Sequence, residues 1–320
     1  MKTRKLGYTD VNLTTVGLGT WALGGSSWKF AWGHQDDKES INTILYALEI
    51  GVNWIDIAPI YGFGHSEEIV GKAIEGLKEK PFIATKCGRR WDKDGNIQGV
   101  LKRDSIRREV EESLRRLKVD VIDLYQIHWP EPDRDIEETW ETIIDFIEEG
   151  IIRYGGVSNF SVEQIKRVQE IHPVASLQPP YSMLKRDMEK ELLPYCKENN
   201  IGVIVYSPMQ KGLLTGSFSR ERVRNLPKDD HRQRDPDFLE PELTANLELV
   251  NALIPIAKKN KKTLSQLAIA WTLRIEEVTS AIVGARHTSQ IEETALASEW
   301  KLSEEDITKI DGLLKEREQK

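Results

Sequence analysis

Residues 119–158 read VDVIDLYQIHWPEPDRDIEETWETIIDFIEEGIIRYGGVS and contain the repeating unit that decides the fold. Two short apolar runs, 119–128 and 152–158, are bounded by glycine or polar residues, which is typical of buried parallel strands. Between them, apolar residues recur at the spacing of one helix face: Ile136, Trp140, Ile143 and Ile147. The stretch therefore predicts a strand, a helix and a second strand parallel to the first.

The same unit recurs along the 320-residue chain. Further strand runs are VGLGTW (16–21), VNWID (52–56), PFIATK (81–86), ASLQ (175–178), IGVIVYS (201–207) and TSAIVG (279–284). A second helix face is formed by Ile106, Val110, Leu114 and Leu117. Eight strands alternate with helices and no linker divides the chain, which favours one α/β domain over residues 1–320. We expect a (β/α)8 TIM barrel rather than an open doubly wound sheet.

Additional elements flank the barrel pattern. Residues 2–16 contain a Gly/Asp turn and predict an N-terminal β-hairpin, and residues 302–320 predict a C-terminal amphipathic helix. Pro255 lies within a helical pattern and predicts a kink or an end there. Two long loops, 24–40 and 209–241, would rise from the C-terminal rim of the strands, where the active sites of such barrels lie.

Charge and composition indicate neither a nucleic-acid nor a membrane partner. The formal net charge is −7 and the isoelectric point is near 5.6, while the basic residues of 101–117 alternate with acidic ones. Cys87 and Cys196 match no metal-ligand spacing, so we expect no metal site and a reducing compartment. The N-terminus lacks a signal-peptide pattern and no run has the length of a membrane span, which favours a cytoplasmic protein. The oligomeric state stays open between a monomer and a weak homo-oligomer.

Three polar residues end predicted strands, namely Asp56, Lys86 and His128, and Tyr61 follows Asp56 by five residues. Because the ends of neighbouring parallel strands lie about 4.8 Å apart, these side chains would converge. A lysine beside a tyrosine lowers the pKa of the phenol, so we expect Tyr61 to donate a proton. Asp56 would hold Lys86, and His128 would orient a carbonyl oxygen or share its proton. Taken singly, each residue also has a structural explanation. Asp56 could cap the end of a strand and Tyr61 could pack in a loop, while Lys86 could be a solvated charge and His128 a buried, hydrogen-bonded core residue.

Eight motifs occur in order along nearly the whole chain: GLGTW (17–21), GVNWIDIAPIYGFGHSEEIVGKAI (51–74), ATKCG (84–88), DLYQIHWPEP (123–132), EEGIIRYGGVSNFS (148–161), LQPPYS (177–182), YSPMQKGLLTG (206–216) and SAIVGARHTSQIEET (280–294). In this order they resemble the aldo-keto reductase family. The resemblance implies an enzyme that reduces aldehydes or ketones with a nicotinamide cofactor. The family's catalytic tetrad carries over as Asp56, Tyr61, Lys86 and His128, with Tyr61 as the general acid.

The same resemblance implies where the cofactor binds. The nicotinamide would meet Ser158, Asn159, Gln178 and Tyr206, and the pocket floor would include Gly19, Thr20, Trp21 and Asp56. The diphosphate would follow Ser207, Pro208, Met209, Gln210, Lys211, Gly212 and Leu213, and the adenosine would meet Gly284, Arg286, Gln290 and Glu293. Because a guanidinium can hold a 2′-phosphate, Arg286 favours NADPH (NADP+ when oxidised), with NADH possible but less favoured.

Four tryptophans near the strand ends predict an aromatic mouth for a small carbonyl substrate: Trp21, Trp28, Trp91 and Trp129. They would suit an aromatic, an aliphatic or a sugar substrate. Two other functions stay open, namely a cofactor-binding regulatory or structural subunit of the potassium-channel β-subunit type and a sugar-phosphate lyase or isomerase. The channel-associated relatives generally lack a histidine at the position of His128, and a lyase or isomerase would not need Tyr61 beside Lys86.

Overall fold

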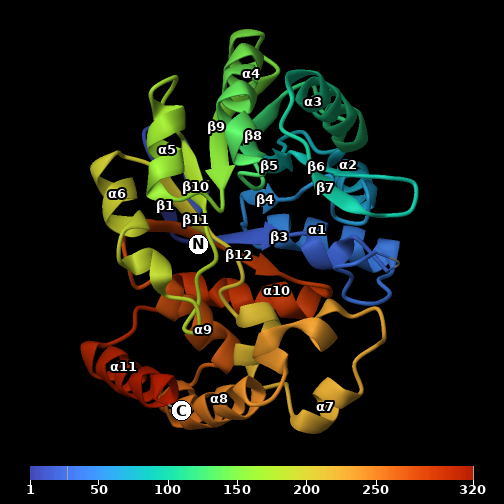
Figure 1. The fold of residues 1–320 in the computed structure, drawn as a ribbon. Helices are drawn as coiled ribbons and strands as arrows, with labels where there is room; N and C mark the ends of the chain where they lie inside the picture. The colour runs from blue at the N-terminus through green and yellow to red at the C-terminus, as the bar shows by residue number, and fades with distance from the viewer. Residues whose placement is uncertain (27, 320) are drawn as a thin grey trace.

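The computed structural model describes residues 1–26 and 28–319 (Figure 1). Residue 27, within the predicted loop 24–40, and residue 320, at the end of the predicted C-terminal helix, lie outside the described residues. A closed barrel of parallel strands lies at the centre, with helices around its outer face (Figure 1). Neighbouring strands around the barrel are β3 (Val16–Gly19), β4 (Trp54–Asp56), β5 (Phe82–Cys87), β8 (Ile122–Ile127), β9 (Ile152–Ser158), β10 (Ser176–Gln178), β11 (Gly202–Val205) and β12 (Val278–Gly284), and β12 pairs with β3.

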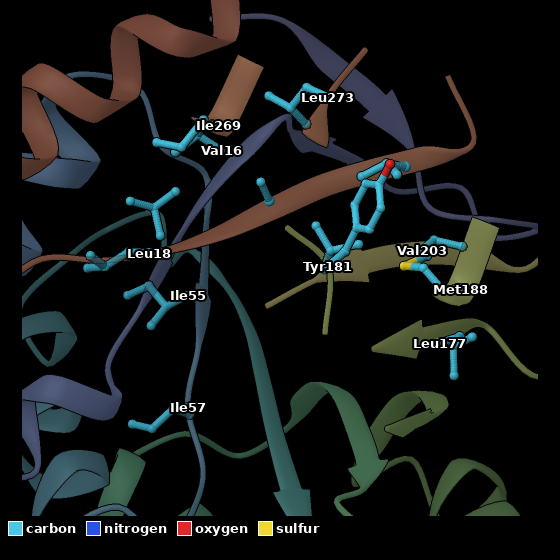
Figure 2. Close-up of a cluster of buried hydrophobic side chains, with 14 of the residues drawn as sticks. Val16, Leu18, Ile55, Ile57, Leu177, Tyr181, Met188, Val203, Ile269 and Leu273 are labelled. Carbon is cyan, nitrogen blue, oxygen red and sulfur yellow. The ribbon is translucent and has the colours of Figure 1, made fainter. Parts of the chain in front are cut away.

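These strands confirm the predicted (β/α)8 TIM barrel. Each overlaps one of the predicted runs, and β5 and β12 extend one residue beyond theirs, to Cys87 and from Val278. The helices are α1 (Asp37–Glu49), α2 (His65–Ile74), α3 (Arg103–Leu117), α4 (Ile136–Glu148), α5 (Val162–Gln169), α6 (Leu192–Glu198), α7 (Arg220–Arg224), α8 (Glu242–Lys259), α9 (Leu264–Thr272), α10 (Thr288–Ala295) and α11 (Glu304–Glu318). Figure 2 shows part of the apolar layer between strands and helices, where Leu18, Ile55 and Ile269 are completely buried. Burial toward both the helices and the barrel interior explains why the strand runs are continuously apolar.

The predicted N-terminal hairpin forms between β1 (Thr3–Lys5) and β2 (Asn12–Thr14) and packs against the barrel interior. Leu13 in β2 and Leu6, which directly follows β1, share one buried cluster with Trp54 and Leu124. The Trp54 indole needs glycine opposite it, because a Cβ atom at Gly17 would lie 2.0 Å from the indole Cε2. The hairpin therefore covers the end of the barrel from which β4 starts.

Three features differ from the sequence prediction or add to it. A hairpin of β6 (Arg89–Trp91) and β7 (Ile97–Gly99) lies between β5 and α3 and was not predicted. The 209–241 loop contains α7 and three short 3₁₀ helices, Gln210–Thr215, His231–Arg234 and Pro236–Phe238. Of the kink or end predicted at Pro255, the end does not occur, because α8 continues past it to Lys259. In the part of the chain that the structure describes, no helix is long and apolar enough to cross a bilayer.

Candidate active site

A cleft of ≈ 1620 Å³ opens where the barrel strands end. Its lining includes residues that end or directly follow six strands: Gly19, Asp56, His128, Ser158, Gln178 and Gly284. This is the C-terminal end of the barrel, which carries the active site in enzymes of this architecture. Within residues 1–26 and 28–319, no group of His, Cys, Asp and Glu side chains is arranged to hold a metal ion.

A buried ion pair forms the floor of the cleft. Lys86 Nζ lies 2.9 Å from each carboxylate oxygen of Asp56 and 2.9 Å from the carbonyl oxygen of Ile57. The Lys86 side chain is fully buried, and that of Asp56 is nearly so. The Asp56 carboxylate also accepts a hydrogen bond of 2.7 Å from Gln178 Nε2. A buried ion pair is stable only if further hydrogen bonds replace those lost to water, and here the Ile57 carbonyl oxygen and the Gln178 amide provide them.

The phenol of Tyr61 lies directly beside this pair, with its oxygen 3.4 Å from Lys86 Nζ. Tyr61 is held in the loop between β4 and α2, where Gly62 adopts a positive φ of 65°. A Cβ atom at Gly62 would lie 2.0 Å from the carbonyl oxygen of Gly24, so the loop can approach so closely only with glycine here. The His128 ring meets the Tyr61 ring edge-on, with centroids 6.0 Å apart. The structure thus brings all four predicted catalytic residues together.

The protonation of these groups follows mainly from burial. Burial raises the pKa of Tyr61 well above its ordinary value, and the negative charge of Asp56 acts in the same direction. The net lowering of this pKa that was predicted from Lys86 is therefore wrong for the protein alone, because burial and the charge of Asp56 outweigh the effect of the lysine. Burial lowers the pKa of His128 well below its ordinary value, with Lys86 and Arg89 acting in the same direction. At neutral pH the site thus contains a protonated phenol and a neutral imidazole.

Glu109 is a buried carboxyl behind the site, on α3. It accepts hydrogen bonds from the backbone N–H of Gly88 at 2.9 Å and from the hydroxyl of Ser105 at 3.3 Å. Burial raises the pKa of Glu109 to about 7 from an ordinary value of 4.5. Because the folded state holds this proton more tightly than the unfolded chain, its contribution to stability is complete below about pH 4.5 and is lost as the pH rises through about 7.

We expect the free energy of unfolding of the wild type, relative to Glu109→Gln, to fall by roughly 3 kcal/mol over that pH range, at about 1.4 kcal/mol per pKa unit. The glutamine variant keeps an acceptor for Gly88 but has no proton to lose. Denaturant unfolding of both proteins at a series of pH values measures the difference. Parallel pH profiles for the two proteins would contradict the raised pKa.

The residues predicted to meet the nicotinamide form one hydrogen-bonded group at the ends of β9, β10 and β11. The Ser158 hydroxyl donates to the Gln178 carbonyl oxygen at 2.9 Å, and Asn159 Nδ2 donates to the Ser158 hydroxyl oxygen and to the His128 carbonyl oxygen, each at 3.0 Å. The Tyr206 hydroxyl donates to Asn159 Oδ1 at 2.8 Å. Apart from His128, which takes part through its backbone carbonyl oxygen, these residues are the predicted nicotinamide contacts, and all five residues line the cleft.

The predicted diphosphate loop only partly faces the cleft. Ser207, Pro208, Met209, Lys211 and Gly212 line it. Gln210 instead accepts a hydrogen bond from Ser182 and donates one to Asp237, and Leu213 is buried in an apolar cluster with Phe218. Thr20 is likewise buried and donates to the Asp56 carbonyl oxygen. Thr20, Gln210 and Leu213, which were predicted to contact the cofactor, therefore pack beneath the residues that line the cleft.

At the predicted adenosine end, Gly284, Arg286, Gln290 and Glu293 all line the cleft. The Arg286 guanidinium is already engaged by the 24–40 loop. Its Nε donates to Gln35 Oε1 at 2.7 Å, and its terminal nitrogens donate to the carbonyl oxygens of Trp32 and His34. The residue that was expected to hold a 2′-phosphate therefore also fixes the position of this loop.

The predicted aromatic mouth forms from three of its four tryptophans. Trp21, Trp28 and Trp129 line the cleft, and the Trp21 ring stacks beside Tyr61 with centroids 6.3 Å apart. Trp91 is placed on β6 and stacks on Phe63 at 5.4 Å, behind the cleft lining. Trp32, in the predicted 24–40 site loop, also lines the cleft, whereas sequence reasoning missed other lining residues, among them Phe63, Arg89, His231 and Arg232. Two of these, His231 and Arg232, lie in the 209–241 loop, whose unusual length was the available signal.

The cleft fits a dinucleotide cofactor together with a small substrate. Its volume of ≈ 1620 Å³ exceeds the roughly 300–1,000 Å³ of pockets for a single drug-sized molecule. One end presents amide and hydroxyl groups beside the Tyr61 phenol, and the other presents Lys211 and Arg286. Cationic side chains at one end and neutral polar groups at the other match the phosphates and the nicotinamide of such a cofactor.

Known proteins provide an independent comparison. The model of the aldo/keto reductase family matches residues 15–315. Aldo-keto reductase YhdN of Bacillus subtilis is 42% identical over 309 residues, covering 96% of this chain and 91% of that protein. The NADH-specific methylglyoxal reductase of Escherichia coli is 37% identical over 322 residues, covering 96% and 97%. Among solved structures, the glycerol dehydrogenase AKR11B4 from Gluconobacter oxydans has a TM-score of 0.89 and 39% identity, covering 98% of this chain and 95% of that one.

Proposed function

This chain belongs to the aldo/keto reductase family of nicotinamide-dependent oxidoreductases, and from this we propose that it reduces an aldehyde or ketone to an alcohol with Tyr61 as the general acid and NADPH as the cofactor. The observation that supports the proposal best is the Tyr61 phenol, whose oxygen lies 3.4 Å from a lysine that Asp56 holds by both carboxylate oxygens. The reduced nicotinamide, when bound, supplies a hydride to the carbonyl carbon. The protein's own residues supply the proton and the orientation.

Tyr61 keeps its proton in the resting site because its pKa is raised. As negative charge develops on the carbonyl oxygen of the substrate, that oxygen becomes the stronger base and takes the phenolic proton. Lys86, 3.4 Å away, then stabilises the phenolate. Asp56 keeps Lys86 at this position throughout.

His128 acts on the same oxygen as a neutral donor. Its depressed pKa leaves one ring N–H for a hydrogen bond to the substrate carbonyl, beside the Tyr61 hydroxyl. Two donors aimed at the oxygen where charge develops lower the barrier in the manner of an oxyanion hole. The presence of His128 with an intact Asp56–Lys86–Tyr61 group supports catalysis over a purely regulatory role.

The preference for NADPH rests on Arg286. We expect Arg286→Ala to raise the dissociation constant for NADPH about tenfold or more and that for NADH by less than about threefold, because only NADPH brings a 2′-phosphate. Equilibrium titration of both cofactors measures this. Equal weakening of both would show that Arg286 does not contact the 2′-phosphate.

Turnover on a panel of carbonyl compounds tests the proposed function. Cofactor oxidation is followed by absorbance with aldehydes, ketones and aldoses, and with NADPH and NADH in parallel. Reduction of at least one class of carbonyl with NADPH supports the proposal and begins to define the substrate. Tight cofactor binding without turnover on any member of the panel would favour a regulatory role.

A further inference from the structure

Arg232 reaches the cleft from the long loop between β11 and α8. Its side chain is only 11% exposed and lines the cleft. Its Nε and one terminal nitrogen donate to the Asp230 carboxylate at 3.0 and 2.6 Å. The other terminal nitrogen donates to the Lys211 carbonyl oxygen at 3.3 Å. The loop therefore carries a guanidinium into the cleft and fixes its orientation there.

Trp32 places Arg232 close to Arg286. The Arg232 guanidinium lies over the Trp32 ring, 4.6 Å from its centroid. The carbonyl oxygen of the same tryptophan accepts a hydrogen bond of 3.2 Å from Arg286. Both arginines also line the cleft. One residue of the 24–40 loop thus contacts two guanidinium groups, one from the long loop and one from the segment before α10.

Three basic side chains line this part of the cleft, and they differ in their partners. Lys211 pairs with Asp235 and Arg232 pairs with Asp230, whose side chain is only 1% exposed. The contacts of Arg286 are with neutral groups, namely the Gln35 amide and two backbone carbonyls. Burial lowers the pKa of Arg286, and the positive charge of Arg232 acts in the same direction while Asp230 opposes it. Among the hydrogen bonds that these three basic residues make in the described chain, those of Arg286 include no carboxylate, and its half-buried guanidinium is therefore suited to bind an anionic group.

We propose that Arg232 and Arg286 together bind the 2′-phosphate of NADPH, and that Asp230 limits how strongly they do so. This inference rests on the proposed function, because it requires the adenosine end of the cofactor to lie at Arg286. Each guanidinium has five N–H donors, and each uses three of them in the contacts above. The remaining donors of two planar guanidinium groups match the oxygens of a phosphate.

Cofactor affinity can be measured without turnover, because Trp21, Trp28 and Trp32 line the cleft and their fluorescence reports occupancy. The probes are NADPH and NADH, together with adenosine 2′,5′-bisphosphate and adenosine 5′-monophosphate, which differ only in the 2′-phosphate. We expect Arg232→Gln to raise the dissociation constant for NADPH about tenfold and that for NADH less than about threefold. Asp230→Asn should tighten NADPH about threefold with little change for NADH.

Arg220→Gln is the matched control. Arg220 lies in the same loop, and the change removes the same charge, but its side chain pairs with Glu240 and is outside the cleft lining in the described chain. It should leave the ratio of the NADPH and NADH affinities unchanged. A general effect of loop charge would shift that ratio in the control as well.

Equal weakening of NADPH and NADH by Arg232→Gln would overturn the inference, because it would place Arg232 at the diphosphate. An unchanged preference for the bisphosphate over the monophosphate in Asp230→Asn would overturn the role of Asp230. If Arg232→Gln does not fold, Arg232→Lys keeps the charge but loses the planar fork, and it should lower the preference for the bisphosphate. Unchanged selectivity in Arg232→Lys would equally overturn the inference.

Failure of the proposed function gives a different result. A wild-type protein that binds neither NADPH nor NADH refutes the proposed function and the inference together. A wild-type protein that binds NADPH but reduces no carbonyl refutes the reductase activity alone, and the effects of Arg232 and Asp230 on affinity then still decide the inference.

Discussion

Replacing Tyr61 by phenylalanine is expected to lower the turnover number for carbonyl reduction by about 10³-fold, within the range that a positioned general acid contributes. Phenylalanine keeps the ring that lies beside Trp21 and His128 and removes only the hydroxyl next to Lys86. The dissociation constant for NADPH should stay within about threefold of the wild type, because the lost group faces the reacting carbonyl rather than the phosphates. Steady-state kinetics and cofactor titration on the same preparation separate these two quantities.

Trp91→Phe is a suitable control for the Tyr61 variant. Trp91 stacks on Phe63 behind the cleft lining, so the change alters an aromatic residue close to the site without touching the tetrad. Its turnover number should stay close to that of the wild type. Near-normal turnover in Tyr61→Phe would show that another group delivers the proton, and parallel loss of cofactor binding would indicate a folding defect.

Replacing Lys86 by methionine should have the second large effect, on both stability and activity. The change leaves the Asp56 carboxylate buried with Gln178 as its remaining side-chain donor. Removal of one partner of a buried ion pair costs about 3–5 kcal/mol of unfolding free energy. Turnover should also be largely lost, because nothing then stabilises the Tyr61 phenolate. Denaturant unfolding and carbonyl reduction measure the two effects.

The double variant Asp56→Asn with Lys86→Met separates structure from catalysis. It removes both charges, so it should recover a large part of the stability lost in Lys86→Met while remaining inactive. If the double variant were as unstable as the two single changes added together, the two side chains would not be coupled, and the ion pair in the cleft floor would not have the role assigned to it.

The barrel could be predicted because its strands are buried on both faces. Runs such as 81–86 and 201–207 are mostly apolar up to the polar residue that ends them, and each supplies one barrel strand. The tetrad followed from the same pattern, since polar residues at the ends of parallel strands have to meet at one rim of a barrel. The β6–β7 hairpin was missed because each of its strands has only three residues and they are incompletely buried. An Asp94–Gly95 turn was the one local signal for it.

Other features depend on contacts that no local pattern contains. The raised pKa of Tyr61 follows from complete burial and from the compensation of Lys86 by Asp56, whereas sequence spacing indicated only that the lysine would be near. Arg232 could not be assigned to the cleft because its neighbours Trp32 and Arg286 are far from it along the chain. Length marked the 209–241 loop as functional, but its contacts with the 24–40 loop determine which of its side chains face the cleft.

The most direct test of the reductase mechanism is the transfer of deuterium from NADPH that carries deuterium in place of both hydrogens at the reactive nicotinamide carbon. A carbonyl compound identified in the substrate panel is incubated with labelled cofactor, and the alcohol is analysed by mass spectrometry. We expect the label on the former carbonyl carbon of the alcohol with the wild type, and a rate of label transfer about 10³-fold lower with Tyr61→Phe. An alcohol formed without the label, or formed equally fast by Tyr61→Phe, would contradict hydride transfer with Tyr61 as the proton donor.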